Sequence, residues 1–180
     1  PLLKNQKIER IDNVTPYEYL DSKYDEDTLV QNYKIEGTFL SISELENIDE
    51  QSIKELFYFV SHGNNAFLSM RTFPKALMDS LKIEVKFEFH QPENNQVWVA
   101  NKNVSLKKYI FQQSVEDYFS KIDTANTTVL GYQSNAKKEK HINFIKVPYK
   151  YGNFYLHTQP AAFTNFHLLK KDHFRYAENV

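Results

Sequence analysis

Two short apolar segments joined by a helix-forming stretch constrain the fold of this 180-residue chain more than any other feature. Residues 38–42 and 66–70 are both apolar, both bounded by turn-forming residues, and both contain Phe-Leu-Ser followed by Ile or Met. Such short apolar runs are typical of buried strands. A strand, a helix and a second strand of this length form a right-handed βαβ unit with parallel strands. The sequence therefore predicts a parallel sheet at its centre.

The segment between these strands has the features of a helix. Asp49 is placed to accept a hydrogen bond from a first-turn N–H, and Gly63 supplies the left-handed residue that ends a helix. The apolar residues that recur at i, i+3, i+4 and i+7 are Ile53, Leu56, Phe57 and Val60. We expect this apolar face to pack on the sheet.

Beyond residue 82 the pattern changes to an alternation of apolar and polar residues, which indicates a strand with one wet face. Pro92–Asn95 resembles a turn, after which 97–99 returns, so we expect an antiparallel hairpin within residues 83–112. This hairpin is an insertion or an edge of the sheet. Apolar residues at helical spacing predict a short helix over 115–122, and a further helix is expected from Thr164.

Together these elements predict an α/β fold: a three-layer sandwich around a mostly parallel central sheet, with an antiparallel hairpin insertion. Residues 1–180 are expected to form one domain, with residues 1–36 irregular apart from a helix turn beginning at Thr15-Pro16. The chain opens on Pro1 and ends in what resembles an unfinished helix. We therefore expect it to be a fragment of a longer protein.

Charge and composition exclude several classes of function. The 22 basic and 23 acidic residues nearly cancel, so no global field attracts nucleic acid. The chain has no cysteine, which excludes disulfides, thiolate metal sites and a cysteine nucleophile. Its four glycines are too far apart for a phosphate-binding loop. Aromatic residues make up 15% of the chain and suggest stacking on a sugar or a single strand, although a core role explains most of them.

Polar residues follow the apolar strands where the strands end. His157 comes after the apolar residues 154–156, and Arg71 comes after the strand that ends at Met70. In an open parallel sheet, ligands bind beyond the carboxyl ends of the strands. The residues expected to share this rim as a ligand-binding site are Ser69, Arg71, His157, Thr158, Gln159 and Asn165. The alternative is that these side chains satisfy backbone groups at the end of the sheet.

No motif in the chain assigns a catalytic residue, a metal ligand or a cofactor. The six histidines do not form His-Glu-x-x-His, and no two of them have the i, i+4 spacing of a shared metal site. Ser69 lies between Leu68 and Met70, without the flanking glycines of a nucleophile elbow.

Several segments resemble an uncharacterised bacterial group, the domain-of-unknown-function 4350 family. They are residues 15–20, 33–40, 55–64, 73–77 and 152–165. The resemblance implies a domain similar to class I glutamine amidotransferases and to flavodoxin-like folds. It also implies flanking membrane helices outside this chain, an additional strand and helix before residue 1, and a location outside the cytoplasm, anchored to the inner membrane. Amidotransferases need a cysteine that this chain lacks, so their activity is not carried over.

The resulting hypothesis is a non-catalytic binding or scaffolding domain that receives an unknown protein or small molecule at the sheet rim. Nucleic acid is not expected as a partner, and contact with a membrane is expected only through segments outside this chain. The alternative hypothesis is a hydrolase that acts on a sugar or amide derivative, with His157 as general base.

Overall fold

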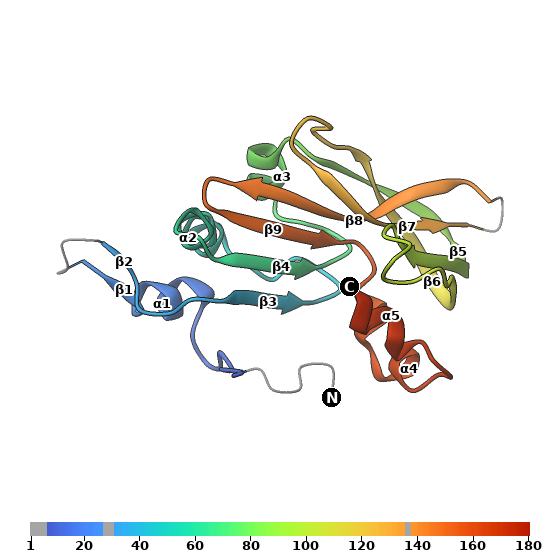
Figure 1. Cartoon of the computed structure of the whole chain (residues 1–180), viewed down its shortest axis with the longest axis horizontal. Helices are drawn as coiled ribbons and strands as arrows, with labels where there is room; N and C mark the ends of the chain where they lie inside the picture. The colour runs from blue at the N-terminus through green and yellow to red at the C-terminus, as the bar shows by residue number, and fades with distance from the viewer. Residues whose placement is uncertain (1–6, 27–30, 136–137) are drawn as a thin grey trace.

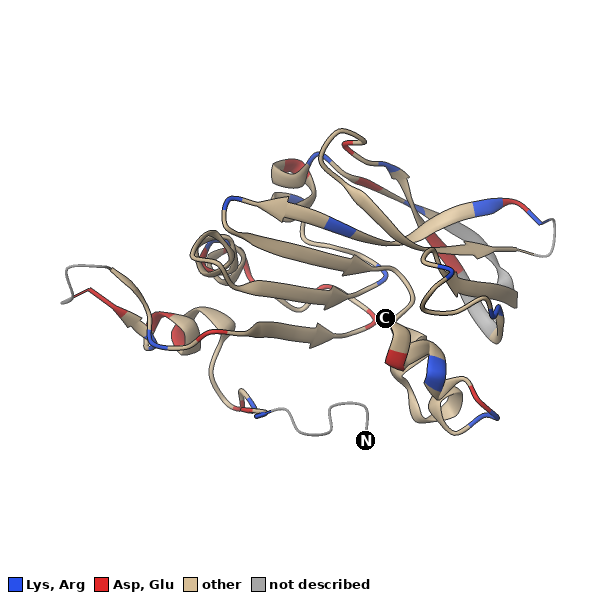
Figure 2. Cartoon of the chain, in the orientation of Figure 1, with Lys and Arg blue, Asp and Glu red and all other residues tan. Residues whose placement is uncertain are grey.

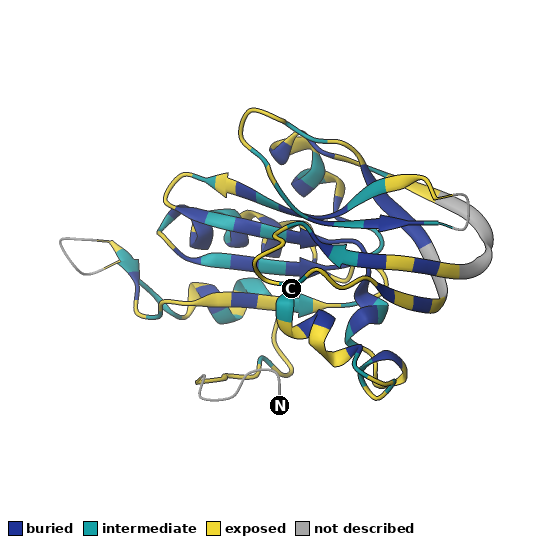
Figure 3. Cartoon of the chain, turned by 45° about the vertical axis from the view of Figure 1, so that its right-hand side comes forward, coloured by how far each residue is buried: buried dark blue, intermediate teal, exposed yellow. Residues whose placement is uncertain are grey.

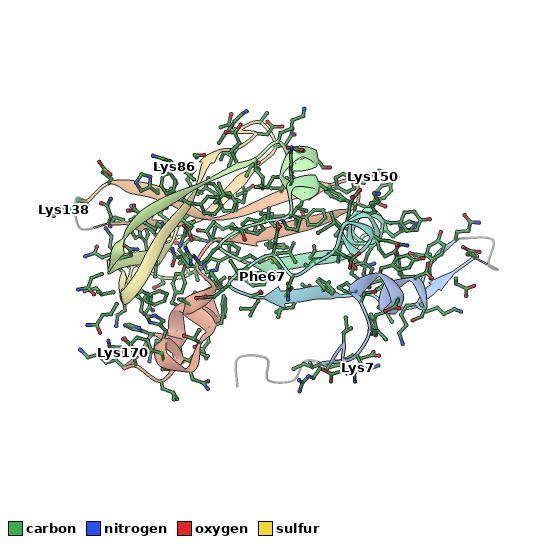
Figure 4. All side chains as sticks on the ribbon, turned by 180° about the vertical axis from the view of Figure 1, so that it is seen from behind. Lys7, Phe67, Lys86, Lys138, Lys150 and Lys170 are labelled. Atoms are coloured by element: carbon green, nitrogen blue, oxygen red, sulfur yellow. The ribbon has the colours of Figure 1, made fainter. Side chains whose placement is uncertain are left out.

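The computed structural model describes residues 7–26, 31–135 and 138–180, and the backbone alone of residues 88–93 and 113–115. Figure 1 shows the arrangement of the elements, and Figure 4 shows the side chains on the same ribbon from behind. They follow in the order α1 (Pro16–Asp21), β1 (Tyr24–Asp25), β2 (Asn32–Tyr33), β3 (Thr38–Ile42), α2 (Glu50–Ser61), β4 (Asn65–Ser69), α3 (Lys75–Leu81), β5 (Glu84–Val99), β6 (Tyr109–Lys121), β7 (Thr128–Ser134), β8 (Lys140–Tyr149), β9 (Gly152–His157), the 3-10 helix η1 (Pro160–Phe163), α4 (Asn165–Leu168) and α5 (Phe174–Asn179). In the described residues, no helix is long and apolar enough to span a membrane.

The main sheet is mixed, with strand order β3-β4-β9-β8-β6-β5-β7. Only the β3–β4 and β4–β9 pairs are parallel, whereas the pairs formed by β5 to β8, and β8–β9, are antiparallel. The three-layer sandwich with a mostly parallel sheet, expected from the sequence, is therefore wrong. A parallel sheet needs a crossover between successive strands, and from β5 to β9 the chain instead connects its strands through loops.

The predicted βαβ unit is confirmed. β3 and β4 run parallel with Phe39 opposite Ala66, and α2 connects them. The side chain of Asp49 accepts a hydrogen bond from the backbone N–H of Ser52 at 2.9 Å, as an N-cap does. Gly63 has a φ of +93°, in the left-handed region that ends a helix. The helix turn expected at Thr15 is also confirmed, because α1 begins there with a capping box.

The antiparallel half of the sheet curls upon itself, so that β7 pairs with β8 as well as with β5. The hairpin expected within residues 83–112 is not found as predicted. β5 continues through Pro92–Asn95 to Val99, with a register shift between Glu88 and Glu93, and its hairpin partner is β6. The helix expected over 115–122 is wrong as well, because that segment belongs to β6. The helix expected from Thr164 forms as two short helices, α4 and α5.

Two apolar clusters lie on different parts of the sheet. The larger packs α2 and α3 against β3, β4, β9 and β8, and includes Leu56, Leu68 and Leu156. The smaller joins β5 and β6 to the C-terminal segment through Tyr176. Figure 1 shows this segment at the carboxyl ends of β3, β4 and β9. Figure 3 shows that β3 is more exposed than the inner strands, and Leu40 at this edge is 49% exposed.

Candidate functional site

The ends of β4 and β9 bring Ser69 and His157, which the sequence predicts to share the rim, into direct contact. The two residues lie opposite each other in the parallel pair, and the Ser69 hydroxyl lies 2.9 Å from Nδ1 of His157. On the other side of the ring, Nε2 of His157 lies 3.0 Å from the hydroxyl of Tyr176, in α5. Nδ2 of Asn143 donates to the same hydroxyl at 3.1 Å. These four side chains form a continuous hydrogen-bonded chain from β4 to β8.

These four hydrogen-bonded side chains are buried away from solvent. Ser69, His157, Asn143 and Tyr176 all have 0% exposure. Burial lowers the pKa of His157 from 6.5 to about 3, because the charged ring would lose its hydration. Burial also raises the pKa of the Tyr176 hydroxyl. At neutral pH the imidazole is therefore uncharged, with one nitrogen donating and the other accepting.

Arg71 and Asp117 form the second polar feature of the rim. Nε of Arg71 donates to Oδ2 of Asp117 at 2.6 Å. Asp117 is fully buried, and its pKa is raised by this burial although the neighbouring guanidinium opposes the shift. The Arg71 side chain is 31% exposed. Among the described residues, its two Nη groups and Oδ1 of Asp117 have no hydrogen-bond partner.

Thr158 and Gln159 support Asp117 through its backbone. The Thr158 hydroxyl donates to the carbonyl of Asp117 at 2.6 Å. Nε2 of Gln133 donates to the same carbonyl at 3.1 Å, and Gln159 in turn donates to Oε1 of Gln133 at 2.8 Å. Arg71, Thr158 and Gln159 therefore all converge on Asp117. These contacts hold the curled half of the sheet against the ends of β4 and β9.

Asn165 is the one predicted rim residue that the structure does not bring to this group. It is exposed at the start of α4. Conversely, sequence reasoning missed Asp117, Gln133, Asn143 and Tyr176. Asp117 falls within the segment misread as a helix, and the other three carry no motif. The feature that identifies these residues is the burial of their polar side chains. Burial can be recognised only when the fold is known.

The residues of the rim do not resemble a metal centre. In the part of the chain that the structure describes, no three His, Asp or Glu side chains gather closely enough to hold a metal ion. A Ser–His pair resembles a nucleophile and its base, yet a substrate has no access to a fully buried pair. At the rim, the Arg71 guanidinium is the group that remains partly exposed to solvent.

Several solved structures share the fold. The "mmIFT52 N-terminal domain" has a TM-score of 0.63 at 11% identity, with 97% of this chain and 82% of that domain covered. The exo-beta-1,4-mannosidase Op5Man5 from Opitutaceae bacterium strain TAV5 has a TM-score of 0.54 at 10% identity, with 80% of this chain covered. The carbohydrate deacetylase Agd3 has a TM-score of 0.53 at 6% identity, with 74% covered.

This chain spans only 25% of the mannosidase and 22% of the deacetylase. Likeness at such low identity concerns the fold alone, and the expected likeness to glutamine amidotransferases is not shown. A comparison with curated protein sequences gives no match. The family model described as "Domain of unknown function (DUF4350)" matches residues 5–180, and the chain belongs to this family.

Proposed function

We propose that this chain is a non-catalytic binding module that holds an acidic group of its ligand or partner on Arg71, at the rim of the sheet. The observation that carries the proposal is the state of the Arg71 guanidinium. Asp117 fixes it through Nε at 2.6 Å, while both Nη groups lack a partner among the described residues. A guanidinium held in this way offers two parallel donors, which is the geometry that a carboxylate or phosphate accepts.

The sealed Ser69–His157 pair supports a non-catalytic role. Both side chains have 0% exposure, and the His157 ring packs against Phe163 of η1 and contacts Tyr176 of α5. The recurrence of the fold as about a quarter of much longer proteins also supports a module that works beside other domains. The membrane tether and the extracytoplasmic location that the family resemblance implies stay predictions.

The proposal is tested by thermal shift with citrate and inorganic phosphate as acidic probes. We expect each probe to raise the melting temperature saturably in the native chain. Arg71→Gln and Arg71→Lys should both abolish the increase, because lysine keeps the charge but not the two-pronged geometry. Lys54→Gln is the matched control, since Lys54 is an exposed cation paired with Glu50 in α2. Equal shifts in the native chain and both Arg71 variants would contradict the proposal.

The Ser69–His157 contact of 2.9 Å favours the alternative, a hydrolase in which His157 acts as general base. That function requires the C-terminal segment to move away from the pair. It predicts turnover of 4-nitrophenyl acetate or a 4-nitrophenyl glycoside that is lost in both Ser69→Ala and His157→Gln. A non-catalytic module predicts turnover no higher than in those variants.

A further inference from the structure

A second surface, on the outside of the curled half of the sheet, combines half-buried aromatic rings with lysines that form no ion pair within the described residues. It consists of Gln96 and Trp98 in β5, Lys108 and Ile110 beside them, Tyr132 in β7 and Lys140 in β8, and is here called the Trp98 face. Arg71 follows β4 and takes no part in it. We propose that the Trp98 face binds an acidic polysaccharide.

The sheet register places these side chains together. Trp98 lies directly opposite Tyr132, and Gln96 lies opposite both Ile110 and Ser134. Trp98 is half-buried, whereas its neighbours Val97 and Val99 are buried, so the indole lies on the outer surface of the strand. The rings of Trp98 and Tyr132 have centroids 6.0 Å apart and planes tilted by 32°. The two rings thus lie against each other across two strands.

The polar atoms of both rings are available to a ligand. Within the described residues, neither the indole N–H of Trp98 nor the hydroxyl of Tyr132 has a hydrogen-bond partner, and the exposed amide of Gln96 lies beside them. Ile110 is 50% exposed and extends the apolar part of the surface. A sugar ring has an apolar C–H side and a rim of hydroxyls. Aromatic rings with free polar groups at their edges match both.

The charges of the face indicate an anionic ligand. Nζ of Lys108 lies 4.2 Å from the centroid of Trp98, and Nζ of Lys140 lies 3.5 Å from the centroid of Tyr132. Neither ammonium forms an ion pair with an acid of the described chain. Each ammonium therefore lies over the face of a ring. A carboxylate on the ligand would draw it off that face, which leaves the ring free for a sugar unit to stack on.

The same observations disfavour a single-stranded nucleic acid. Such a ligand carries a phosphate at every unit, and proteins that bind it follow the backbone with a continuous basic groove. Figure 2 shows basic and acidic residues interspersed along the ribbon, and the formal net charge is −1. Two isolated ammonium groups match a ligand in which the stacking ring itself carries the charge.

Affinity electrophoresis in gels that contain alginate tests the proposal. We expect alginate to retard the native chain, and sodium chloride to weaken the effect. Lys108→Gln with Lys140→Gln should weaken binding about tenfold, and Trp98→Ala should do so by a similar factor. Trp98→Phe, which keeps a ring, should restore most of the affinity and guards against a loss that merely reflects unfolding.

Lys146→Gln is the matched control, because Lys146 lies over the ring of Tyr155 in the same sheet but outside the Trp98 face. It should bind alginate as the native chain does. Retardation that is lost in Arg71→Gln but kept in the lysine and Trp98 variants would place the binding at the rim and overturn the proposal. Equal retardation in the lysine, Trp98 and native forms would overturn the proposal. So would retardation by hydroxyethyl cellulose equal to that by alginate, or binding of a thymidine oligonucleotide in place of alginate.

Discussion

Gly152 lies at the start of β9, where this strand packs against the end of α2. A Cβ atom there would lie 1.9 Å from the carbonyl oxygen of Asn64 and 2.4 Å from that of Val60. Both contacts are with backbone, which cannot rotate away as a side chain can. Glycine at this position therefore lets β9 approach the βαβ unit closely enough to pair with β4.

We expect Gly152→Ala to destabilise the protein by about 3 kcal/mol or to prevent folding, because α2 and β9 must separate to admit the methyl group. Urea unfolding followed by circular dichroism measures the loss. Tyr151→Ala is the neighbouring control, since the Tyr151 side chain is 86% exposed and its removal should change stability by less than about 0.5 kcal/mol. A stable Gly152→Ala protein would contradict the close packing described.

The buried imidazole of His157 makes stability depend on pH. Its pKa is about 3 in the folded protein and about 6.5 when it is exposed, so only the unfolded chain takes up this proton between those values. Stability contributed by His157 is therefore complete above pH 6.5 and declines as the pH falls, by at most about 1.4 kcal/mol per unit. His167, whose pKa burial lowers to about 4, adds to the decline.

Urea unfolding at pH 7.5 and pH 5 should show a smaller loss in His157→Gln than in the native chain. Glutamine keeps polar atoms at the site and takes up no proton. Carboxyl groups contribute the same background to both proteins and cancel in the comparison. Identical pH dependence in the two proteins would show that His157 is not sealed as described.

Among the elements, the C-terminal segment owes its position to one side chain. Tyr176 is fully buried in the smaller apolar cluster, and its hydroxyl joins His157 to Asn143. We expect Tyr176→Phe to cost about 1–3 kcal/mol, because it leaves polar atoms of both partners buried without a hydrogen bond. In Tyr176→Phe, amide hydrogen exchange should accelerate more in α5 than in α2. Tyr151→Phe, at an exposed position, should leave both rates unchanged.

The contrast between β3-α2-β4 and β6 explains how far sequence alone predicts this fold. Asp49, Gly63 and the apolar face of α2 are local signals that each specify a helix and its ends, and all of them are confirmed. In β6, Glu116, Asp117, Tyr118 and Phe119 are buried in succession because both faces of the strand are covered. A strand buried on both faces has no alternation to detect, so its apolar residues matched a helical spacing instead.

The candidate site, too, could be predicted only in part. The contact between Ser69 and His157 follows from two strand ends that the sequence reveals. Tyr176 and Asp117 reach the rim through pairings and a chain reversal that have no local signature. Asn165, which the sequence predicts at the rim, is exposed instead, because η1 lies between it and the end of β9.

Across the whole molecule, the Arg71–Asp117 pair connects the parallel half of the sheet to the curled half. Its contribution can be isolated with a double-mutant cycle of Arg71→Ala and Asp117→Asn. We expect a coupling of about 2 kcal/mol, since the pair is a charge-assisted hydrogen bond with one fully buried partner. Additive effects of the two substitutions would show that this pair does not contribute to holding the halves together.

The return of β7 onto β8 has a consequence for assembly. Because β7 pairs with β5 on one side and with β8 on the other, β3 is the terminal strand of the main sheet within the described chain. An open sheet has two such strands and can add molecules without limit, as fibres do. A sheet with one edge stops after a single addition. Pairing of two molecules through β3 would use the terminal strand of both main sheets, so addition at this strand ends at two molecules.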